Sequence, residues 1–384
     1  MHDTVLLVLV IVTAVSFDFT NGFHDTANAM ATSIATGALK PRVAVGLSAV
    51  LNLLGAFISV SVAATIASGI VDASKVTLPI IFSGLLGAII WNVLTWYFGL
   101  PSSSSHALVG GVIGATAVVA GFSAIKTSSV LSKVIIPALL SPFIAGVVAA
   151  VATFAAYRIS NPNGMPGTRS TFRYGQLASA SLVSLAHGTN DAQKTMGVVT
   201  LALITDGHLP KNATPPIWVI AMCGVAIAAG TYLGGWRVIR TVGHRLTKVE
   251  PPQGFAAETA SAAVLLISTH GGVPLSTTQI TTGSVVGSGL GKRAAEVRWG
   301  VAGRMAGAWV LTIPCAAVVA ALVGVITHHG NTPGTVAVAI VAAAALFGVW
   351  MHSRREPVSA DNVNDTSGAD TNPQGLGRLA SSPT

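Results

Sequence analysis

The chain has 384 residues, of which 51% are hydrophobic and only 9% are charged. Soluble domains carry about a quarter charged residues, so this composition excludes an ordinary water-soluble protein and favours a polytopic protein of the lipid bilayer. The formal net charge of +8 does not require nucleic acid, because the distribution of the basic residues matters more than their sum. We expect no nucleic-acid partner.

Apolar stretches of roughly spanning length follow one another along the whole chain. They lie near residues 4–36, 43–69, 78–99, 103–121, 133–157, 174–205, 215–235, 255–271, 275–290, 299–325 and 334–351. A span needs about 20 residues, so the longer stretches at 4–36 and 174–205 are expected to be broken or tilted at their polar motifs. The short, glycine-rich stretches at 103–121 and 275–290 suggest half-helices of re-entrant hairpins. The expected fold is an all-α polytopic membrane protein with about 10–12 membrane segments.

The basic residues predict the orientation of these segments. If the chain crosses at every stretch from an outside N-terminus, sixteen Lys and Arg residues between Lys40 and Arg378 fall inside. Only four fall outside, namely Lys75, Lys126, Lys133 and Lys211. This positive-inside bias predicts a multi-pass protein of the cell membrane with an outer N-terminus and a cytoplasmic C-terminus.

The same crossing pattern divides the chain into units. We predict a first repeat at 1–157, a short cytoplasmic linker at 158–173 and a second repeat at 174–352. The second repeat contains a basic cytoplasmic loop at 236–253, and the polar tail at 353–384 is expected to be disordered. Five crossings precede the linker, so the two repeats should be inverted relative to each other.

A polar motif occurs once in each predicted repeat. Residues 21–32 read Asn-Gly-Phe-His-Asp-Thr-Ala-Asn-Ala-Met-Ala-Thr, and residues 187–198 read His-Gly-Thr-Asn-Asp-Ala-Gln-Lys-Thr-Met-Gly-Val. Aligned on Asp25 and Asp191, Asn28 falls opposite Lys194. Charged and amide side chains are costly at bilayer depth, so they usually mark a substrate or ion path. Their duplication indicates a two-fold transport site.

A second motif is duplicated in the same order. Residues 101–114 read Pro-Ser-Ser-Ser-Ser-His-Ala-Leu-Val-Gly-Gly-Val-Ile-Gly, and residues 274–287 read Pro-Leu-Ser-Thr-Thr-Gln-Ile-Thr-Thr-Gly-Ser-Val-Val-Gly. Proline and hydroxyl residues before an apolar helix are a helix-start signal. The free N–H groups of such a helix end attract phosphate-like anions. The candidate anion ligands are Ser103, Ser104, Ser105, Ser276, Thr277 and Thr278; the alternative is that these hydroxyls only cap the helices.

The acidic motifs carry the types of ligand that suit cations. Asp25 and Asp191 supply carboxylates, and Asn21, Asn28 and Asn190 supply amide oxygens, all of which are hard ligands. They could instead bridge broken backbone between helices. The two cysteines, Cys223 and Cys315, lie in apolar stretches, so we expect neither a disulfide nor a structural metal site. No cofactor is expected.

Two further ionisable groups lie at membrane depth. Lys194 is expected either to pair with Asp191 three residues earlier or to contact the anion directly. In both cases it fills a position that a cation would otherwise hold, which favours proton or metal coupling over sodium. Glu258, opposite Leu85 in the repeat, is either a proton carrier or a helix-start acid. Four histidines flank the motifs and are candidates for titration: His24, His106, His187 and His270.

The two Asp motifs and the Pro-Leu-Ser-Thr-Thr-Gln element together resemble the signatures of the inorganic phosphate transporter (PiT) family. The form is most similar to the bacterial low-affinity Pit permeases, and the resemblance covers about residues 4–350. It implies an inverted-repeat fold with two re-entrant hairpins and inorganic phosphate held by the hairpin hydroxyls, with Gln193 nearby. It also implies coupling cations at Asp25, Asn28 and Asp191, and it makes a homodimer plausible. Bacterial members are regarded as proton symporters that accept neutral metal–phosphate complexes with magnesium-type ions, whereas other members use sodium.

Three alternatives remain beside a phosphate symporter. A sodium-coupled phosphate or sulfate permease fits the same motifs. An intramembrane hydrolase would use Ser105 and His106, but adjacent helical residues point about 100° apart. A channel would use the filter-like run from Thr281 to Gly287, which instead follows a helix-start signal. We therefore expect a transporter and not an enzyme.

Overall fold

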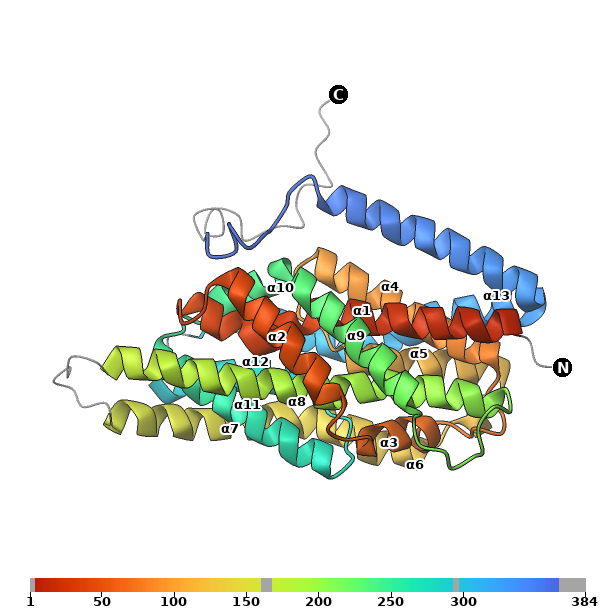
Figure 1. The fold of residues 1–384 in the computed structure, drawn as a ribbon, viewed down its shortest axis with the longest axis horizontal. Helices are drawn as coiled ribbons and strands as arrows, with labels where there is room; N and C mark the ends of the chain where they lie inside the picture. The colour runs from red at the N-terminus through yellow and green to blue at the C-terminus, as the bar shows by residue number, and fades with distance from the viewer. Residues whose placement is uncertain (1–3, 160–167, 293–296, 366–384) are drawn as a thin grey trace.

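The computed structural model describes residues 4–159, 168–292 and 297–365. Regular structure within these ranges is helical, apart from isolated β-bridges between Val71 and Ile125 and between Thr247 and Val297. The α-helices are α1 (Thr4–Ala35), α2 (Pro41–Ala56), α3 (Ser61–Gly69), α4 (Leu78–Tyr97), α5 (Ser104–Val119), α6 (Thr127–Val130), α7 (Ile136–Ile159), α8 (Thr168–Thr205), α9 (Ile217–Leu233), α10 (Trp236–Arg240), α11 (Pro251–His270), α12 (Thr277–Lys292) and α13 (Trp299–Ser353). Most of them run along one common direction in a bundle (Figure 1).

Several helices are long and apolar enough to cross a membrane. In the described part of the chain, four segments meet this criterion: Thr4–Ala35, Leu78–Tyr97, Thr127–Ile159 and Trp299–Ser353. Two bent helix pairs bring the number to six. The outer helices also expose large apolar side chains, such as Phe143 on α7 and Val310 on α13. Such a surface suits contact with lipid.

The expected breaks at the polar motifs were wrong. Helices α1 and α8 run through their Asp motifs without interruption over 32 and 38 residues. Neither helix contains proline, and their polar side chains find partners on neighbouring helices, so the backbone need not open. The bends lie elsewhere. Helices α2 and α3 are bent by 73°, and the segment from α9 through α10 is bent by 59°.

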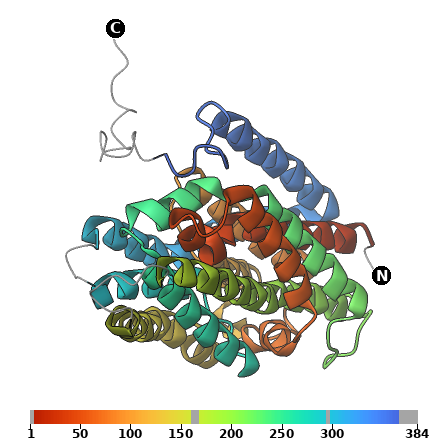
Figure 2. The ribbon, with the colours of Figure 1, turned by 60° about the vertical axis from the view of Figure 1, so that its left-hand side comes forward.

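The last helical element also contains a break. Helical geometry extends from Trp299 to Ser353, but Asn331 has a non-helical backbone with φ of 50° and ψ of −151°. Proline follows at position 333. The element therefore consists of two helices, as the separate stretches at 299–325 and 334–351 predicted. The second of these helices lies at the edge of the bundle (Figures 1 and 2).

The two Asp-motif helices pack in matching ways. Helix α1 packs on α9 at Gly22, where a Cβ atom would lie 2.3 Å from the carbonyl oxygen of Ile227. Helix α8 packs on α2 at the aligned Gly188, where a Cβ atom would lie 2.2 Å from the carbonyl oxygen of Asn52. Both contacts need glycine because backbone meets backbone. Figure 1 shows α1 and α8 running in opposite directions.

The shorter helices repeat this correspondence. Helix α5 packs against α13, and a Cβ atom on Gly114 would lie 2.1 Å from the oxygen of Ala317. Helix α12 packs against α7, and a Cβ atom on Gly287 would lie 2.0 Å from the oxygen of Gly146. Each short helix is therefore held by a long helix from the other half of the chain.

The predicted loops and tail differ in part from the structure. The segment 236–253 contains α10 and a π-helical turn at Thr241–Arg245, so it is not a simple loop. The chain beyond α13 is placed as far as residue 365, whereas the sequence predicts disorder from 353. Arg237 and Arg240 donate to the carbonyl oxygens of Glu356 and Asn362, and Val363 is fully buried. The rest of the predicted tail, and 160–167 of the predicted linker, lie outside the described residues.

Candidate functional site

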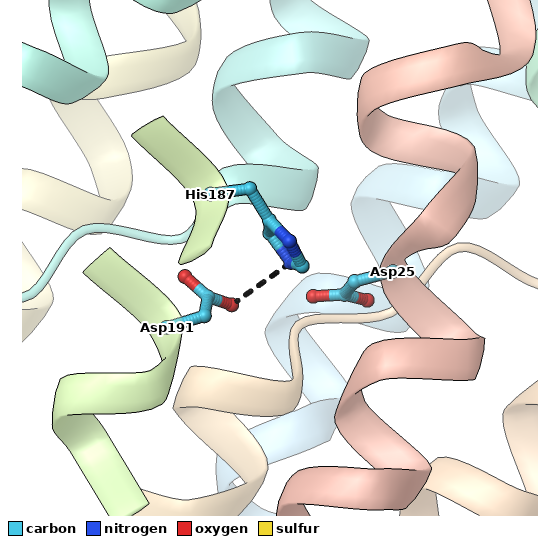
Figure 3. A group of neighbouring side chains, drawn as sticks. All are labelled: Asp25, His187 and Asp191. Atoms are coloured by element: carbon cyan, nitrogen blue, oxygen red, sulfur yellow. Dashed lines mark ion pairs between the residues drawn. The ribbon is translucent and has the colours of Figure 1, made fainter. Parts of the chain in front are cut away.

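The centre of the molecule brings the two Asp motifs together. Asp25 on α1 and Asp191 on α8 face each other across the side chain of His187 (Figure 3). One possible ligand atom from each of the three lies within 4.8 Å of the others, and all three side chains are buried. The imidazole Nε2 of His187 is 3.5 Å from Oδ2 of Asp191. The duplication therefore predicted the meeting of the two carboxylates.

Asp25 receives hydrogen bonds from both short helices. The Ser104 hydroxyl of α5 donates to Oδ2 at 2.8 Å, and the Thr278 hydroxyl of α12 donates to Oδ1 at 3.3 Å. His24 places Nδ1 2.6 Å from Oδ1. One buried carboxylate thus joins the first turns of two helices that are far apart in the sequence.

Asp191 is held mainly by its own helix. Lys194 Nζ lies 2.7 Å from Oδ1, and the amide of Asn190 donates to the same oxygen at 2.9 Å. Asn21 on α1 lies 3.5 Å from Oδ2. The expected pairing of Lys194 with Asp191 is present in the structure, and it compensates the buried negative charge.

The first turn of α12 lies between the two carboxylates. The Thr277 hydroxyl is 3.4 Å from Oδ2 of Asp25 and 3.3 Å from Oδ2 of Asp191. The Asn28 amide donates to the hydroxyls of Thr277 and Thr278 at 3.3 and 3.0 Å. Asn28 therefore presents its nitrogen, and not its oxygen, to the centre of the site.

Lys194 also reaches the other duplicated motif. Its Nζ donates to the Ser105 hydroxyl at 2.5 Å and to the carbonyl oxygen of Leu275 at 3.0 Å. The ammonium thus pairs with the carboxylate and also contacts a candidate anion ligand, while its direct contact with the anion stays a prediction.

Two of the predicted hydroxyl ligands act as helix caps. Ser103 accepts a hydrogen bond from the backbone N–H of His106 at 3.2 Å, at the start of α5. Ser276 accepts from the N–H of Gln279 at 3.3 Å, at the start of α12. N-capping side chains satisfy one free donor of the first turn. For these two positions the capping alternative describes the structure, while the next two hydroxyls of each motif contact the carboxylates or Lys194.

Gln193 lies apart from the carboxylates. Its Oε1 accepts from the backbone N–H groups of Val62 and Ala63 at 2.7 and 3.3 Å, so its carbonyl oxygen caps the start of α3. Its Nε2 donates to the carbonyl oxygen of Thr189. The structure thus shows Gln193 joining α8 to α3, and no feature of the sequence indicated that contact.

Glu258 on α11 lies against α1, beyond Asp25 toward the C-terminal end of that helix. Three hydroxyls, those of Thr32, Ser33 and Ser179, donate to its carboxylate at 2.6 Å each, and Gln176 donates at 3.3 Å. Thr32 follows Asp25 by seven residues, which is about 10 Å along a helix axis. Glu258 therefore forms a separate buried site near the C-terminal end of α1.

A residue that the sequence analysis did not single out supports His187. Asn52 on α2 contacts the His187 ring, with Oδ1 3.1 Å from Nδ1, and its Nδ2 donates to Thr231 on α9 at 2.8 Å. All three side chains are buried. An asparagine within an apolar stretch was the available signal, because such amides need partners when buried. The contact leaves Nε2 of His187 directed at the two carboxylates.

The arrangement suits a cation and an anion together. Two carboxylates and one imidazole are ligands for a divalent cation, and hydroxyls at two helix N-termini are donors for an oxyanion. An anion alone would be repelled by Asp25 and Asp191. A bound cation or proton removes that repulsion and leaves the hydroxyls free to turn toward the anion.

Comparison with known proteins identifies the family. Residues 21–320 match the model of the Phosphate transporter family. The chain belongs to this family. It is 57% identical over 361 residues to a probable low-affinity inorganic phosphate transporter of Mycobacterium tuberculosis (strain ATCC 25618 / H37Rv), covering 94% of this chain and 87% of that protein. A relative of the same description from Bacillus subtilis (strain 168) is 42% identical over 83% of this chain and 96% of its own length.

A solved structure shares the fold. The sodium-dependent phosphate transporter superposes with a TM-score of 0.75 at 23% sequence identity, over 83% of this chain and 98% of that chain. Together with the family match and the spanning helices, this describes a multi-pass membrane transporter and not an enzyme. The hydrolase alternative is thereby removed.

Proposed function

We propose that this protein is a secondary active transporter that imports inorganic phosphate, driven by protons and carrying phosphate free or with a magnesium-type cation. The observation that supports this most directly is the meeting of Asp25 and Asp191 with hydroxyls from the N-termini of α5 and α12. The family and the names of the relatives point to the same substrate.

Phosphate binding in this proposal uses the first turns of the two short helices. Ser104, Ser105, Thr277 and Thr278 would supply hydroxyl donors, and the helix N-termini would supply partial positive charge. In the structure these hydroxyls face carboxylates or Lys194. Neutralising the carboxylates by a cation or a proton would free the same O–H groups for phosphate oxygens. This shared use couples the two ligands, because each favours binding of the other.

A divalent cation would fit between the motifs. Asp25, His187 and Asp191 offer one oxygen, one nitrogen and one oxygen within a small volume. A doubly charged cation and a doubly charged phosphate form a neutral complex, which lowers the cost of burying either charge. The role of Asn28 would then be to orient the two threonine hydroxyls.

We assign the coupling proton to carboxyl groups on α1 or in contact with it, those of Asp25 and Glu258. Glu258 contacts α1 at Thr32 and Ser33, two turns beyond Asp25, and is surrounded by hydroxyl donors. A carboxyl group at this position could receive a proton when the central site releases phosphate. We include Asn190 and Lys194 in the coupling group because both donate to Oδ1 of Asp191.

Alternating access would use the duplicated architecture. The matched contacts of α1 with α9 and of α8 with α2 support two inverted repeats related about the central site. We propose that the repeats are 1–157 and 174–352, with the N-terminus outside and the C-terminus in the cytoplasm. A homodimer belongs to the same proposal.

The nearest competing function is a sodium-coupled permease for phosphate or sulfate. The shared fold with the sodium-dependent phosphate transporter favours it. Lys194 argues against sodium at the central site, because it occupies the position in the second motif that Asn28 occupies in the first. Its ammonium would take the place of a bound cation. Sulfate resembles phosphate in shape but stays doubly charged and carries no proton near neutral pH.

Uptake of radiolabelled phosphate into proteoliposomes tests the proposal. Proton and sodium gradients are imposed separately, each with and without magnesium, and sulfate is tested as a competitor. We expect uptake to follow the proton gradient and to rise with magnesium. Uptake that requires sodium would contradict the proton coupling, and uptake of sulfate in preference to phosphate would contradict the substrate. Glu258→Gln should lose the proton dependence while phosphate binding persists.

A further inference from the structure

A further buried carboxylate, that of Asp18, lies on α1 outside the sites described above. Asp18 precedes Asp25 by seven residues, so it lies on the same helix face about 10 Å closer to the N-terminus. Its relative exposure is 0%. Neither of its oxygens accepts a hydrogen bond from any residue in 4–159, 168–292 or 297–365. A fully buried acid normally has partners, so this one calls for a ligand.

The polar groups around Asp18 are also unsatisfied. Thr195 on α8 and Asn21 on α1 interact with the carboxylate, but not at hydrogen-bonding distance and angle. Within the described part of the chain, Oγ1 of Thr195 and Oδ1 of Asn21 have no hydrogen-bond partner either. Three neighbouring buried side chains, those of Asp18, Asn21 and Thr195, thus carry four oxygen atoms that have no hydrogen-bond partner in the described residues.

The internal repeat shows what is unusual here. The contacts of Gly55 with Leu185 and of Gly230 with Phe19 match across the two halves, which aligns α2 with α9. At the contact of α8 with α2, the Ser184 hydroxyl donates to Ser48 at 3.0 Å. The equivalent positions at the contact of α1 with α9 are Asp18 and Cys223.

The contact of α1 with α9 therefore has an acid beside a thiol, where the contact of α8 with α2 has a neutral, hydrogen-bonded pair of serines. Cys223 is buried and lies within electrostatic range of Asp18. A thiol is only a weak donor, so it does not satisfy a carboxylate. The first half of the chain has gained a negative charge that its counterpart lacks.

We propose that Asp18, Asn21 and Thr195 form a binding site for a monovalent cation such as Na⁺. Oxygen-only ligands suit a hard cation. The neighbouring Lys194 and Asp191 already neutralise each other at 2.7 Å, so one positive charge makes the whole group neutral. A divalent ion would leave an excess charge among apolar helices. A proton would join only two of the four oxygens, whereas a metal cation can coordinate all of them.

The cation would link two helices, α1 and α8, at one level of the bundle. Its ligands come from α1 and α8, and Cys223 of α9 lies beside them. The site does not depend on the proposed transport of phosphate, because none of its three ligands belongs to the hydroxyl set around Asp25. Bound cation should therefore stabilise the protein even without phosphate or magnesium.

Thermal unfolding of the purified protein in phosphate-free and magnesium-free buffer tests the site. NaCl is titrated against choline chloride at constant ionic strength, so that only specific binding changes the melting temperature. We expect sodium to raise the melting temperature of the wild type and of the control variant Asp72→Asn, whose carboxylate lies in an exposed loop. Asp18→Ser, which copies Ser184, should abolish the sodium response.

Thr195→Val provides a second variant that keeps the charge. It should raise the sodium concentration for half-maximal stabilisation by roughly tenfold, as expected for losing one ligand of a charged partner. An equal sodium response in wild type and Asp18→Ser would overturn the proposal. So would a wild-type melting temperature that depends on pH but not on sodium, since Asp18 would then hold a proton.

Failure of this site and failure of the proposed function give different results. Asp25→Asn should lose phosphate uptake and keep the sodium-dependent stabilisation. A protein that imports phosphate but shows no sodium response retains the proposed function without the cation site. A protein that shows the sodium response but imports no phosphate retains only the cation site.

Discussion

The ammonium of Lys194 donates to the hydroxyl of Ser105 at 2.5 Å, although the two residues belong to different motifs in different halves of the chain. The same ammonium pairs with Asp191 at 2.7 Å. One side chain therefore connects a carboxylate proposed to act in coupling with a hydroxyl proposed to bind phosphate. Removing it should affect both the stability of the protein and its transport.

Lys194→Met should strongly destabilise the protein. It leaves Asp191 charged and buried without its main partner, and breaking such a pair costs about 3–5 kcal/mol. The fraction of monodisperse protein after extraction and its melting temperature measure this loss. The double variant Asp191→Asn with Lys194→Met removes both charges and should recover stability but not phosphate uptake. A stable single variant with full uptake would contradict the assigned role of Lys194.

Asp25→Asn and Asp191→Asn should each reduce phosphate uptake to background while leaving membrane insertion intact. The amide has the shape of the carboxylate, but it offers no negative charge to a cation and takes up no proton. Asp191→Asn also leaves the buried ammonium of Lys194 without its partner, so the stability of that variant should fall as in Lys194→Met. Uptake per inserted molecule is the measurement, and Asp72→Asn is the control. Wild-type uptake by either variant would exclude that carboxylate from coupling.

Ser104→Ala combined with Thr277→Ala should weaken phosphate affinity more than maximal rate. Each lost hydrogen bond to a charged ligand is worth about 1.5–3 kcal/mol, so the half-saturation concentration should rise by more than tenfold. Thr259→Ala, which removes an exposed hydroxyl on α11, should behave as wild type. An unchanged half-saturation concentration would mean that the hydroxyls serve only the structure.

The duplicated motifs account for what the sequence could predict. The alignment of Asp25 with Asp191 and of the two hydroxyl runs anticipated that these groups meet, because matched polar residues in apolar stretches share one buried site. It could not anticipate that Gln193 turns toward Val62 or that Val363 is buried against the bundle. Those contacts join residues far apart in the sequence, and neither periodicity nor spacing records them.

The sequence could not show that α1 continues through its polar motif without a break. The sequence shows polar residues inside an apolar run, and either a broken backbone or lateral partners would satisfy them. The partners of Asp25 come from α5 and α12, at separations of 79 and 253 residues in the sequence. Only the folded arrangement decides between the two solutions.

Gly188→Ala should prevent correct packing of α8 on α2. The added methyl group would lie 2.2 Å from the carbonyl oxygen of Asn52, where backbone cannot move away easily. Gly46→Ala is the matched control on α2, because its Cβ would meet no atom within 4 Å. The control should be stabilised by up to about 1 kcal/mol through helix propensity. Equal melting temperatures of the two variants would argue against the close approach.

Glu250 and Lys292 give a pH-dependent contact outside the membrane-spanning segments. The Lys292 ammonium lies 2.8 Å from Oε1 of Glu250, and the Tyr157 hydroxyl donates to Oε2 at 2.6 Å. Partial burial works against ionisation, but the hydrogen bonds from Lys292 and Tyr157 outweigh it and hold the pKa of Glu250 below its ordinary value of 4.5. The contact joins the ends of α7, α11 and α12.

The sign of the pH effect follows from this lowered pKa. The unfolded chain binds the proton more readily, so the contact contributes its full stability above about pH 4.5 and loses it as the pH falls through the folded pKa. The Glu250 side chain is 39% exposed, and solvent screening limits the contribution to about 1 kcal/mol or less. Melting temperatures of wild type and Glu250→Gln between pH 7 and pH 4 measure it. The wild type should have the higher melting temperature at pH 7, and the difference in melting temperature from Glu250→Gln should shrink toward pH 4. Lys292→Met should behave like Glu250→Gln. A difference that grows on acidification would contradict the contact.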